Sequence, residues 1–304
     1  MFVRVALIGI GLIGSSLARV IRRDGLAGHL AACARSEATR AAVMKLGIAD
    51  SVTDDPAIAA ADADLVVICT PVGAYGAVAE AIGPVLKPGC IVSDVGSVKR
   101  VVIDTLSPHL PAGVYLVPGH PVAGTENSGP DAGFDTLFEG RWTILTPPPG
   151  TDEAAVEKVA ELWRHAGSLI DRMDADHHDQ VLAITSHVPH LIAYTIVGTA
   201  TDLEDRLKSE VIKFAASGFR DFTRIAASDP VMWRDIFLAN RDAVLEMMGR
   251  LTEDLSSLQR AIRDGDGDAL ETLFRRTREI RRSVVEAGQH IPPKPPGDTS
   301  GDDE

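Results

Sequence analysis

Three glycines near the N-terminus constrain the fold more than any other feature of this chain. Gly9, Gly11 and Gly14 form a Gly-x-Gly-x-x-Gly pattern between an apolar run, Phe2 to Ile8, and a helical pattern, Leu12 to Arg23. In such a turn the glycines allow a tight bend, close approach of the backbone to a pyrophosphate, and close packing of helix on strand. The pattern predicts a dinucleotide-binding βαβ unit. Its expected cofactor contacts are Gly9, Gly11, Leu12, Ile13 and Gly14.

Short apolar strands alternate with helical patterns through the rest of the N-terminal half. This alternation is typical of a doubly wound parallel sheet, so the expected fold class is α/β with a Rossmann-like N-terminal domain. The expected strands are Phe2–Ile8, Leu30–Ala34, Leu65–Cys69, Cys90–Ser93 and Val114–Val117, with helices at Glu37–Leu46 and Gly76–Val85. Two further strands are expected at Trp142–Leu145 and Ser168–Arg172, with Thr151 capping the helix between them.

The pattern changes after Asp176, where convincing strands cease and helical patterns remain. A long helix is expected from Asp229 (N-cap) and Pro230 onward. It carries an apolar seam with alternating steps of four and three, which resembles a coiled coil and favours a subunit interface over internal core. The seam consists of Val244, Met248, Leu251, Leu255, Leu258 and Ile262.

Gly265-Asp266-Gly267 should end this helix, and Asp268 with Glu271 resembles a capping box for a last helix that runs to about Ala287. The sequence therefore divides into a dinucleotide-binding domain (1–174), an all-α domain for substrate binding and dimerisation (175–290), and a disordered acidic tail (291–304).

Charge and cysteine content narrow the possible partners and compartment. The net charge of −13 argues against nucleic acid or an anionic membrane as a partner. The three cysteines, Cys33, Cys69 and Cys90, lack metal-type spacing and are expected to be reduced packing residues, which fits a cytoplasmic protein. We expect no secretory leader before Phe2 and no apolar run long enough to span a bilayer.

The end of the second strand bears on the identity of the dinucleotide. An acidic residue about twenty positions after the last glycine usually binds the adenosine ribose of NAD. Here the strand ends in Arg35 and Ser36, which suit a 2′-phosphate, so NADP is favoured and NAD remains possible. The alternative is that Arg35 only stacks on adenine. Thr70 and Pro71, after the next strand, should line the same cleft.

Two segments carry candidate proton chemistry. His120 follows the apolar run Val114–Val117 within the segment Pro118–Glu126, which we interpret as a loop held by glycine and proline. Histidine is the side chain best suited to accept a proton near neutral pH. Ser97 follows the strand that ends near Asp94, so it should contact a ligand, cap the helix that begins at Lys99, or do both.

Candidate substrate-binding residues lie in the helical half. His187 and His190 are three residues apart and could face one site; a metal is not expected there because no further ligand has suitable spacing. Arg220 and Arg224 are one helical turn apart. Arginine suits bidentate carboxylate binding. We expect Arg220 to pair with Asp221 and Arg224 to be the ligand-binding residue.

Taken together, these segments resemble the prephenate and arogenate dehydrogenases of tyrosine biosynthesis, from Gly9 to about Ala287. The most specific matches are Asp94–Lys99, Gly119–Glu126, Ser186–His190 and Phe222–Ala226, with Asp229-Pro230 and Trp233. The resemblance implies oxidative decarboxylation of a cyclohexadienol, prephenate or arogenate, by a cytoplasmic homodimer that uses NAD(P). The choice between the two substrates stays open.

The resemblance also implies roles for individual residues. His120 would accept the hydroxyl proton, and Ser97 would bond the same hydroxyl and could orient His120. Arg224 would bind a substrate carboxylate, His190 would line the pocket with His187 nearby, and Glu126 would shape or gate the site. One rival is a β-hydroxyacid-type dehydrogenase, which needs a catalytic lysine on the helical domain. The other is a non-catalytic NADP sensor, which needs neither a base nor a carboxylate-binding residue.

Overall fold

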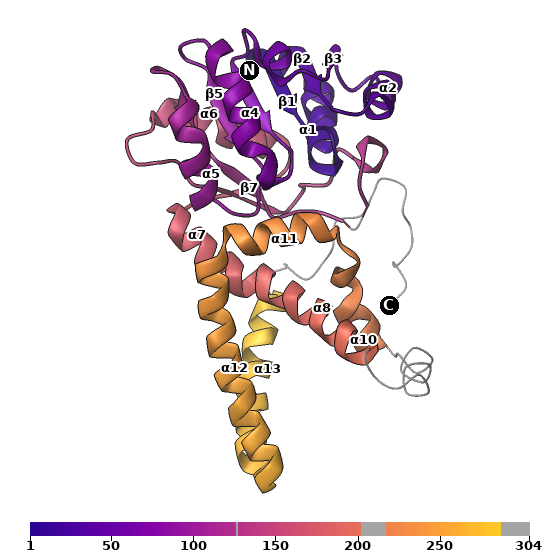
Figure 1. Ribbon diagram of the computed structural model, residues 1–304, viewed down its shortest axis with the longest axis vertical. Coiled ribbons are helices and arrows are strands. Elements are labelled where there is room, and N and C mark those ends of the chain that lie inside the picture. The colour runs from indigo at the N-terminus through magenta and orange to yellow at the C-terminus, as the bar shows by residue number, and fades with distance from the viewer. Residues whose placement is uncertain (126, 202–216, 287–304) are drawn as a thin grey trace.

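The N-terminal part of the protein is built on a six-stranded parallel sheet (Figure 1). The computed structural model describes residues 1–125, 127–201 and 217–286. The strand order is β3-β2-β1-β4-β5-β6, the order of a dinucleotide-binding fold. This confirms the expected fold class. The strands are β1 (Phe2–Ile8), β2 (Ala27–Cys33), β3 (Ser51–Thr53), β4 (Leu65–Ile68), β5 (Ile91–Asp94) and β6 (Tyr115–Leu116).

Helices cover both faces of this sheet, because each strand is apolar on both sides. One core cluster packs β1 and β4 against α1 (Leu12–Arg23), α2 (Glu37–Leu46) and α6 (Glu153–His165). A second cluster on the opposite face involves α3 (Pro56–Ala60), α4 (Tyr75–Ile82) and α5 (Arg100–Leu106). The helices predicted at Leu12–Arg23 and Glu37–Leu46 have the expected bounds.

A second, three-stranded sheet places His120 on a strand, which corrects the expectation of a loop. β7 (Gly119–Pro121) runs antiparallel to β8 (Trp142–Leu145), and β8 runs parallel to β9 (Leu169–Arg172). His120 lies opposite Ile144. Two prolines flank this short segment and disfavour a strand locally, but pairing with β8 overrides that preference.

The chain is helical from residue 175 in the parts that the structure describes. α7 (Ala175–Leu182), the π-helical turn η5 (Ala183–His187) and α8 (Val188–Thr201) follow one another without a break. α10 (Ser217–Thr223) and the short turn η6 (Arg224–Ala227) precede α11 (Pro230–Ala239), α12 (Arg241–Asp264) and α13 (Gly267–Glu286). The predicted tail and the end of the last predicted helix, from residue 287, lie outside the described residues.

Three expectations about helix ends were wrong. Asn240 interrupts the long helix predicted from Asp229, because the Asn240 side chain turns inward to bond the carbonyl of Asp179 at 2.8 Å. Asp152 rather than Thr151 caps α6, since its carboxylate accepts the amide of Ala154. Asp266 rather than Asp268 accepts the first free amide of α13, that of Ala269. Asp229 caps α11 as predicted.

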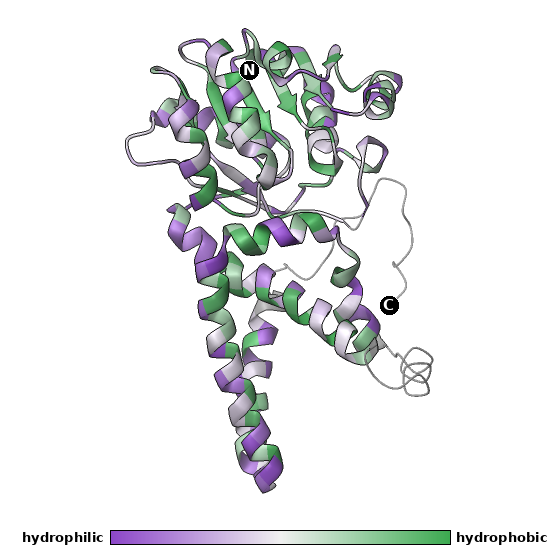
Figure 2. Cartoon of the chain, viewed as in Figure 1, coloured by the Kyte–Doolittle hydropathy of each residue, from purple (hydrophilic) through white to green (hydrophobic). Residues whose placement is uncertain are grey.

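The helical part lies beneath the sheet domain, and α12 and α13 form a hairpin that projects away from it (Figure 1). α11 joins the two parts: Trp233 and Ile236 pack on Val98, which precedes α5. Apolar positions recur along both hairpin helices (Figure 2). Within this single chain, large apolar side chains of the hairpin are more than half exposed: Leu245, Leu255, Ile262, Phe274 and Ile280.

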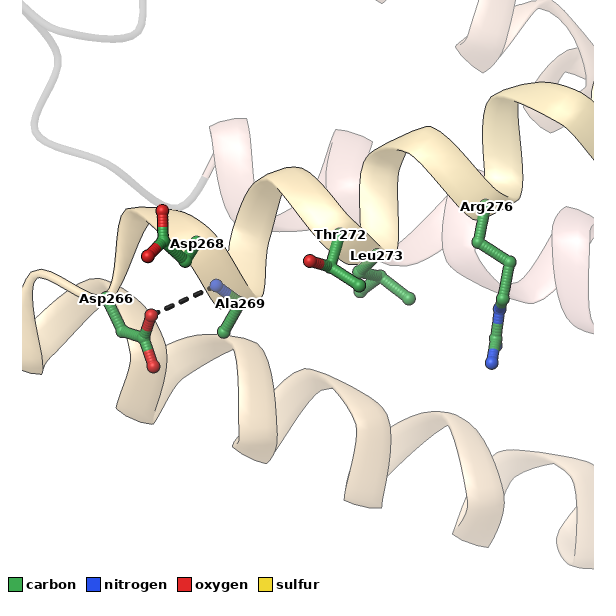
Figure 3. Close-up of a pocket in the computed structure, with 6 residues that line it drawn as sticks. All are labelled: Asp266, Asp268, Ala269, Thr272, Leu273 and Arg276. Carbon is green, nitrogen blue, oxygen red and sulfur yellow. Dashed lines mark hydrogen bonds between the residues drawn. The ribbon is translucent and has the colours of Figure 1, made fainter.

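A hollow lies along the start of α13, beside the turn of the hairpin and at the opposite end of the molecule from β7 (Figures 1 and 3). Its lining includes Asp266, Leu273 and Arg276. The carboxylate of Asp266 is occupied in capping the amide of Ala269 at 3.0 Å. The hollow therefore belongs to the hairpin turn rather than to the site described below.

The helical stretch Ala175–Ala200 corrects one expectation about membranes. It is 26 residues long with mean hydropathy 1.4, so by length and composition alone it could cross a bilayer. It nevertheless contains Asp179 and His187, two buried polar residues that bond the start of α5 and Asn240. These contacts tie the stretch to the rest of the fold.

Trp163 should be a main source of stability on the α6 face of the sheet. Its ring is 1% exposed and meets Phe138 edge-on, with ring centroids 5.1 Å apart. We expect Trp163→Ala to lower the free energy of unfolding by about 3–5 kcal/mol, because it removes a large buried ring and leaves a cavity. Trp142 is 38% exposed and provides the control. Urea denaturation that gives equal losses for Trp163→Ala and Trp142→Ala would contradict this assignment.

Candidate active site

The turn between β1 and α1 has a shape that only glycine permits at two positions. Gly9 has φ +101°, and a Cβ there would lie 2.7 Å from the carbonyl carbon of Cys69. A Cβ on Gly14 would lie 2.3 Å from the carbonyl oxygen of Gly9. By contrast, a Cβ on Gly11 would meet nothing within 4 Å, so this residue borders open space. The turn therefore brings β1, β4 and α1 together and keeps room beside Gly11.

The open side of this turn fits the pyrophosphate of a dinucleotide. Gly11 caps α1 without any side-chain hydrogen bond to the first helical amides, so the helix N-terminus can receive an anion. Leu12 and Ile13 begin that helix and are half-buried. At the end of β4, the buried hydroxyl of Thr70 has no partner among the described residues, and Pro71 beside it is exposed. Thr70 and Gly9 lie side by side at the topological switch point of the sheet.

The last residues of β2 are buried, but Arg35 and Ser36 just beyond the strand are exposed. Arg35 is exposed, while the Ser36 hydroxyl accepts the amide of Thr39 at 3.0 Å and so caps α2. Sequence reasoning overlooked Arg40, whose guanidinium donates to the carbonyls of Ala34 (2.9 Å) and Arg35 (2.6 Å). Arg40, in the first turns of α2, thus holds the backbone that leads from β2 into that helix.

A buried ion pair fixes the far end of β5. Lys99 and Asp94 are both fully buried, and the Lys99 ammonium lies 2.6 and 2.8 Å from the two carboxylate oxygens. The same ammonium donates to the carbonyl of Gly119 at 2.7 Å. Asp94 also accepts the Tyr75 hydroxyl (3.0 Å) and the amides of Gly96 (2.7 Å) and Gly119 (3.2 Å). Both backbone polar groups of Gly119 are therefore held, immediately before His120.

His120 lies at the start of a buried hydrogen-bonded series that the sequence did not reveal. Its side chain is 7% exposed, and its Nδ1 lies 2.8 Å from Nε2 of His178 on α7. Nδ1 of His178 lies 2.8 Å from Oδ1 of Asp179. The Asp179 carboxylate also accepts the amides of Lys99 (2.8 Å) and Arg100 (2.9 Å) at the start of α5. The adjacent histidines His177-His178 look alike in the sequence and favour a solvated helix start; in the structure His177 is exposed, but His178 is buried.

Burial sets the protonation of these histidines. It lowers the pKa of His120 well below its ordinary value, and the neighbouring His178, Lys99 and His187 act in the same direction. Burial also lowers the pKa of His178, which the hydrogen bond to Asp179 opposes. It likewise lowers the pKa of the Lys99 ammonium, against the attraction of Asp94. His120 is consequently neutral near pH 7 and able to accept a proton.

His187 and His190 meet around the indole ring of Trp233. The His190 ring stacks on Trp233 with centroids 3.6 Å apart, and the His187 ring meets it edge-on at 6.1 Å. His190 Nδ1 donates to the carbonyl of Ser186 at 2.9 Å, and His187 Nδ1 lies 3.1 Å from the Asn240 amide. Trp233 belonged to the matched motifs without a role; the structure places it at the centre of this group.

Arg224 lies near His190, as a shared site requires. Burial is the main cause of the lowered pKa of His190, and the charge of Arg224 contributes to it. Arg224 is exposed at the start of η6. Arg220 pairs with Asp221 at 3.0 Å, as predicted.

The structure tests one expected role of Ser97 and does not describe Glu126. Ser97 is half-buried in the turn between β5 and α5, and it does not cap α5: the Asp179 carboxylate receives the amides of Lys99 and Arg100 instead. The cap interpretation of Ser97 was therefore wrong, and its contact with a ligand stays a prediction. The Nδ1 of His120 is bonded to His178, so His178 orients the ring in this structure. Glu126 lies outside the described residues.

The fold and the site together define a class of protein. A 3-2-1-4-5-6 parallel sheet with a glycine turn, a neutral buried histidine and a histidine–arginine group on appended helices is the architecture of a nicotinamide dinucleotide-dependent dehydrogenase. Two family models match the chain: "Prephenate dehydrogenase, nucleotide-binding domain" over residues 17–171, and "Prephenate dehydrogenase, dimerization domain" over residues 174–276.

Individual relatives agree with these matches. The cyclohexadienyl dehydrogenase of Zymomonas mobilis is 43% identical over 283 residues, 93% of this chain and 96% of the relative. The prephenate dehydrogenase of A. aeolicus, solved with hydroxyphenyl propionate and NAD+, superposes with TM-score 0.84 at 32% identity, over 93% of this chain and 98% of that one. The Synechocystis arogenate dehydrogenase superposes with TM-score 0.79 at 26% identity, over 92% and 99%. This chain belongs to the prephenate dehydrogenase family and is an oxidoreductase.

The buried histidines should make stability depend on pH. Burial lowers the pKa of His187 from 6.5 to about 4. Between these values the unfolded chain binds more protons than the folded chain, so the free energy of unfolding falls as the pH drops through this window. We expect His187 alone to account for a loss of roughly 2 kcal/mol between pH 7.5 and pH 5.0.

Urea denaturation of the wild type and of His187→Gln at both pH values measures this loss, because the variant should lack it. His177→Gln, at an exposed position, should behave as the wild type does. An equal pH dependence in wild type and His187→Gln would show that His187 does not titrate in this way.

Proposed function

We propose that this enzyme oxidatively decarboxylates prephenate, arogenate or both to the corresponding 4-hydroxyphenyl product. The observation that carries the proposal is a neutral, buried histidine at the sheet edge, with a histidine–arginine group on the adjoining helices. The names of the relatives, cyclohexadienyl, prephenate and arogenate dehydrogenase, support the same substrate class.

His120 supplies the base in this proposal. A nicotinamide dinucleotide held at the Gly9–Gly14 turn would supply the acceptor for the hydride of the carbinol carbon. Because a hydroxyl proton is too weakly acidic to leave unaided, the free Nε2 of His120 accepts it while the carbon–oxygen bond becomes a carbonyl. The bond to the ring carboxylate then breaks, CO2 leaves, and its electron pair makes the ring aromatic. The oxygen is now a phenolate and regains the proton from His120, so the reaction releases no net proton.

Other residues bind the substrate. Arg224 pairs with a substrate carboxylate, since a dianionic substrate in a protein of net charge −13 needs a local guanidinium. His190, with His187 behind it, lines the pocket against Trp233. Ser97 bonds the reacting hydroxyl, and Glu126 shapes or gates the entrance.

We also propose NADP as the preferred cofactor, with NAD as the alternative. Arg35 is exposed at the end of β2, where a carboxylate would repel a 2′-phosphate and a guanidinium attracts it. The assembly is a cytoplasmic homodimer formed through the helical part. The match to a dimerization domain and the exposed apolar side chains of the hairpin support this assembly.

His120→Gln tests the base directly. We expect kcat to fall by at least about 100-fold, the usual scale of general base catalysis, while cofactor affinity is retained. Reduced cofactor is followed by absorbance with each substrate, and cofactor binding by fluorescence titration. His109→Gln, at an exposed position on the surface, is the matched control. A His120→Gln enzyme with wild-type kcat would exclude this base, and a wild type inert on both substrates would exclude the reaction.

Arg35→Asp tests the cofactor preference. The substitution should lower kcat/KM with NADP by about tenfold or more and raise the relative use of NAD, because a carboxylate replaces the cation facing the 2′-phosphate. Steady-state kinetics with both cofactors measure the ratio. An unchanged ratio would mean that Arg35 does not read the 2′ position.

A further inference from the structure

We infer that His178, held by Asp179, is a positioning residue that fixes the tautomer of His120 and shares the proton His120 removes from the substrate. The inference deepens the proposed function and rests on it for the role of His120 as base. Its evidence is the continuous series His120–His178–Asp179, with two successive hydrogen bonds of 2.8 Å.

The direction of these hydrogen bonds follows from Asp179. Its two oxygens accept the amides of Lys99 and Arg100, so it is an acceptor and Nδ1 of His178 must donate to it. A neutral His178 then has its lone pair on Nε2, which accepts Nδ1–H of His120. Nε2 of His120 is left as the basic nitrogen. The series therefore selects the one tautomer that can accept a proton from a ligand.

The local charge favours a proton on His178 rather than on His120. The charged groups that face the two histidines are Lys99 from the start of α5, Asp94 from β5 and Asp179 from α7; His187 from η5 faces them as a neutral ring. One cation and two carboxylates carry a net charge of −1. Burial, with His178, Lys99 and His187 acting in the same direction, makes His120 a weak base, whereas Asp179 and Asp94 favour an imidazolium at His178.

Sharing the proton between His120 and His178 also agrees with the proton balance of the reaction, in which the proton taken from the hydroxyl is later returned. When Nε2 of His120 gains the hydroxyl proton, Nδ1–H can move to Nε2 of His178, which is then an imidazolium paired with Asp179. The reverse transfer returns the proton to the phenolate oxygen as the ring becomes aromatic. No solvent proton is needed, which suits residues that are buried: His120 is 7% exposed and His178 is fully buried.

His178→Gln separates proton sharing from packing. A glutamine oxygen can still accept Nδ1–H of His120 and keep its tautomer, but it cannot take up a proton. We expect kcat to fall at least tenfold, KM to change less than threefold, and the apparent pKa of the acidic limb of the kcat profile to move downward. His177→Gln, at the exposed neighbouring position, should match the wild type in all three. A wild-type kcat and pH profile in His178→Gln would overturn the inference.

A second measurement needs neither turnover nor the variant to fold. ¹⁵N NMR of the histidine-labelled wild type should show His120 as the Nδ1–H tautomer near pH 7, and a proton on Nε2 instead would overturn the inference. Because this result is independent of substrate, it separates failure of the inference from failure of the proposed function. An enzyme inert on both substrates would refute the reaction, whereas an active enzyme with the other tautomer would refute only the role of His178.

Discussion

The site depends on one buried ion pair, Asp94 with Lys99. Asp94 ends β5 and Gly119 begins β7, and the carboxylate and ammonium together hold both the amide and the carbonyl of Gly119. His120 follows directly, so this pair positions the His120 ring, the proposed base, relative to the sheet edge. Removing one partner of a buried ion pair leaves an uncompensated charge, which typically costs about 3–5 kcal/mol. Replacing both partners of a buried ion pair by apolar residues is, by contrast, often neutral for stability, so the pair positions the site more than it stabilises the fold.

The sheet domain and the helical part also meet at the turn between β5 and α5, through hydrogen bonds to Asp179. Asp179 on α7 accepts two amides at the start of α5, and Asn240 before α12 bonds the Asp179 carbonyl. These bonds hold the helical part against the turn that follows β5, which ends at Lys99. Trp233 packs on Val98 in that turn. The residues that hold the His120 ring and the residues around Trp233 are thus fixed by the contacts that join the two parts.

Local patterns predicted the sheet and the cofactor turn well, because strand periodicity and the glycine spacing are encoded within a few residues. The strand β7, which carries His120, was not predicted, because its partner strand β8 lies more than twenty positions away in the sequence. His178 was missed for the same reason: nothing beside it distinguishes a buried histidine from the exposed His177. The run Asp94–Lys99 was recognised as a motif, but burial of both charges is visible only in three dimensions.

A structure of the enzyme with oxidised cofactor and a 4-hydroxyphenyl carboxylic acid tests the central claim most directly. The account predicts that Nε2 of His120 lies within about 2.6–3.2 Å of the ring hydroxyl, with Nδ1 still bonded to His178. The carboxylate should meet Arg224. A ring hydroxyl bound beyond reach of His120, or a His120 side chain turned so that Nδ1 faces the ligand, would contradict it.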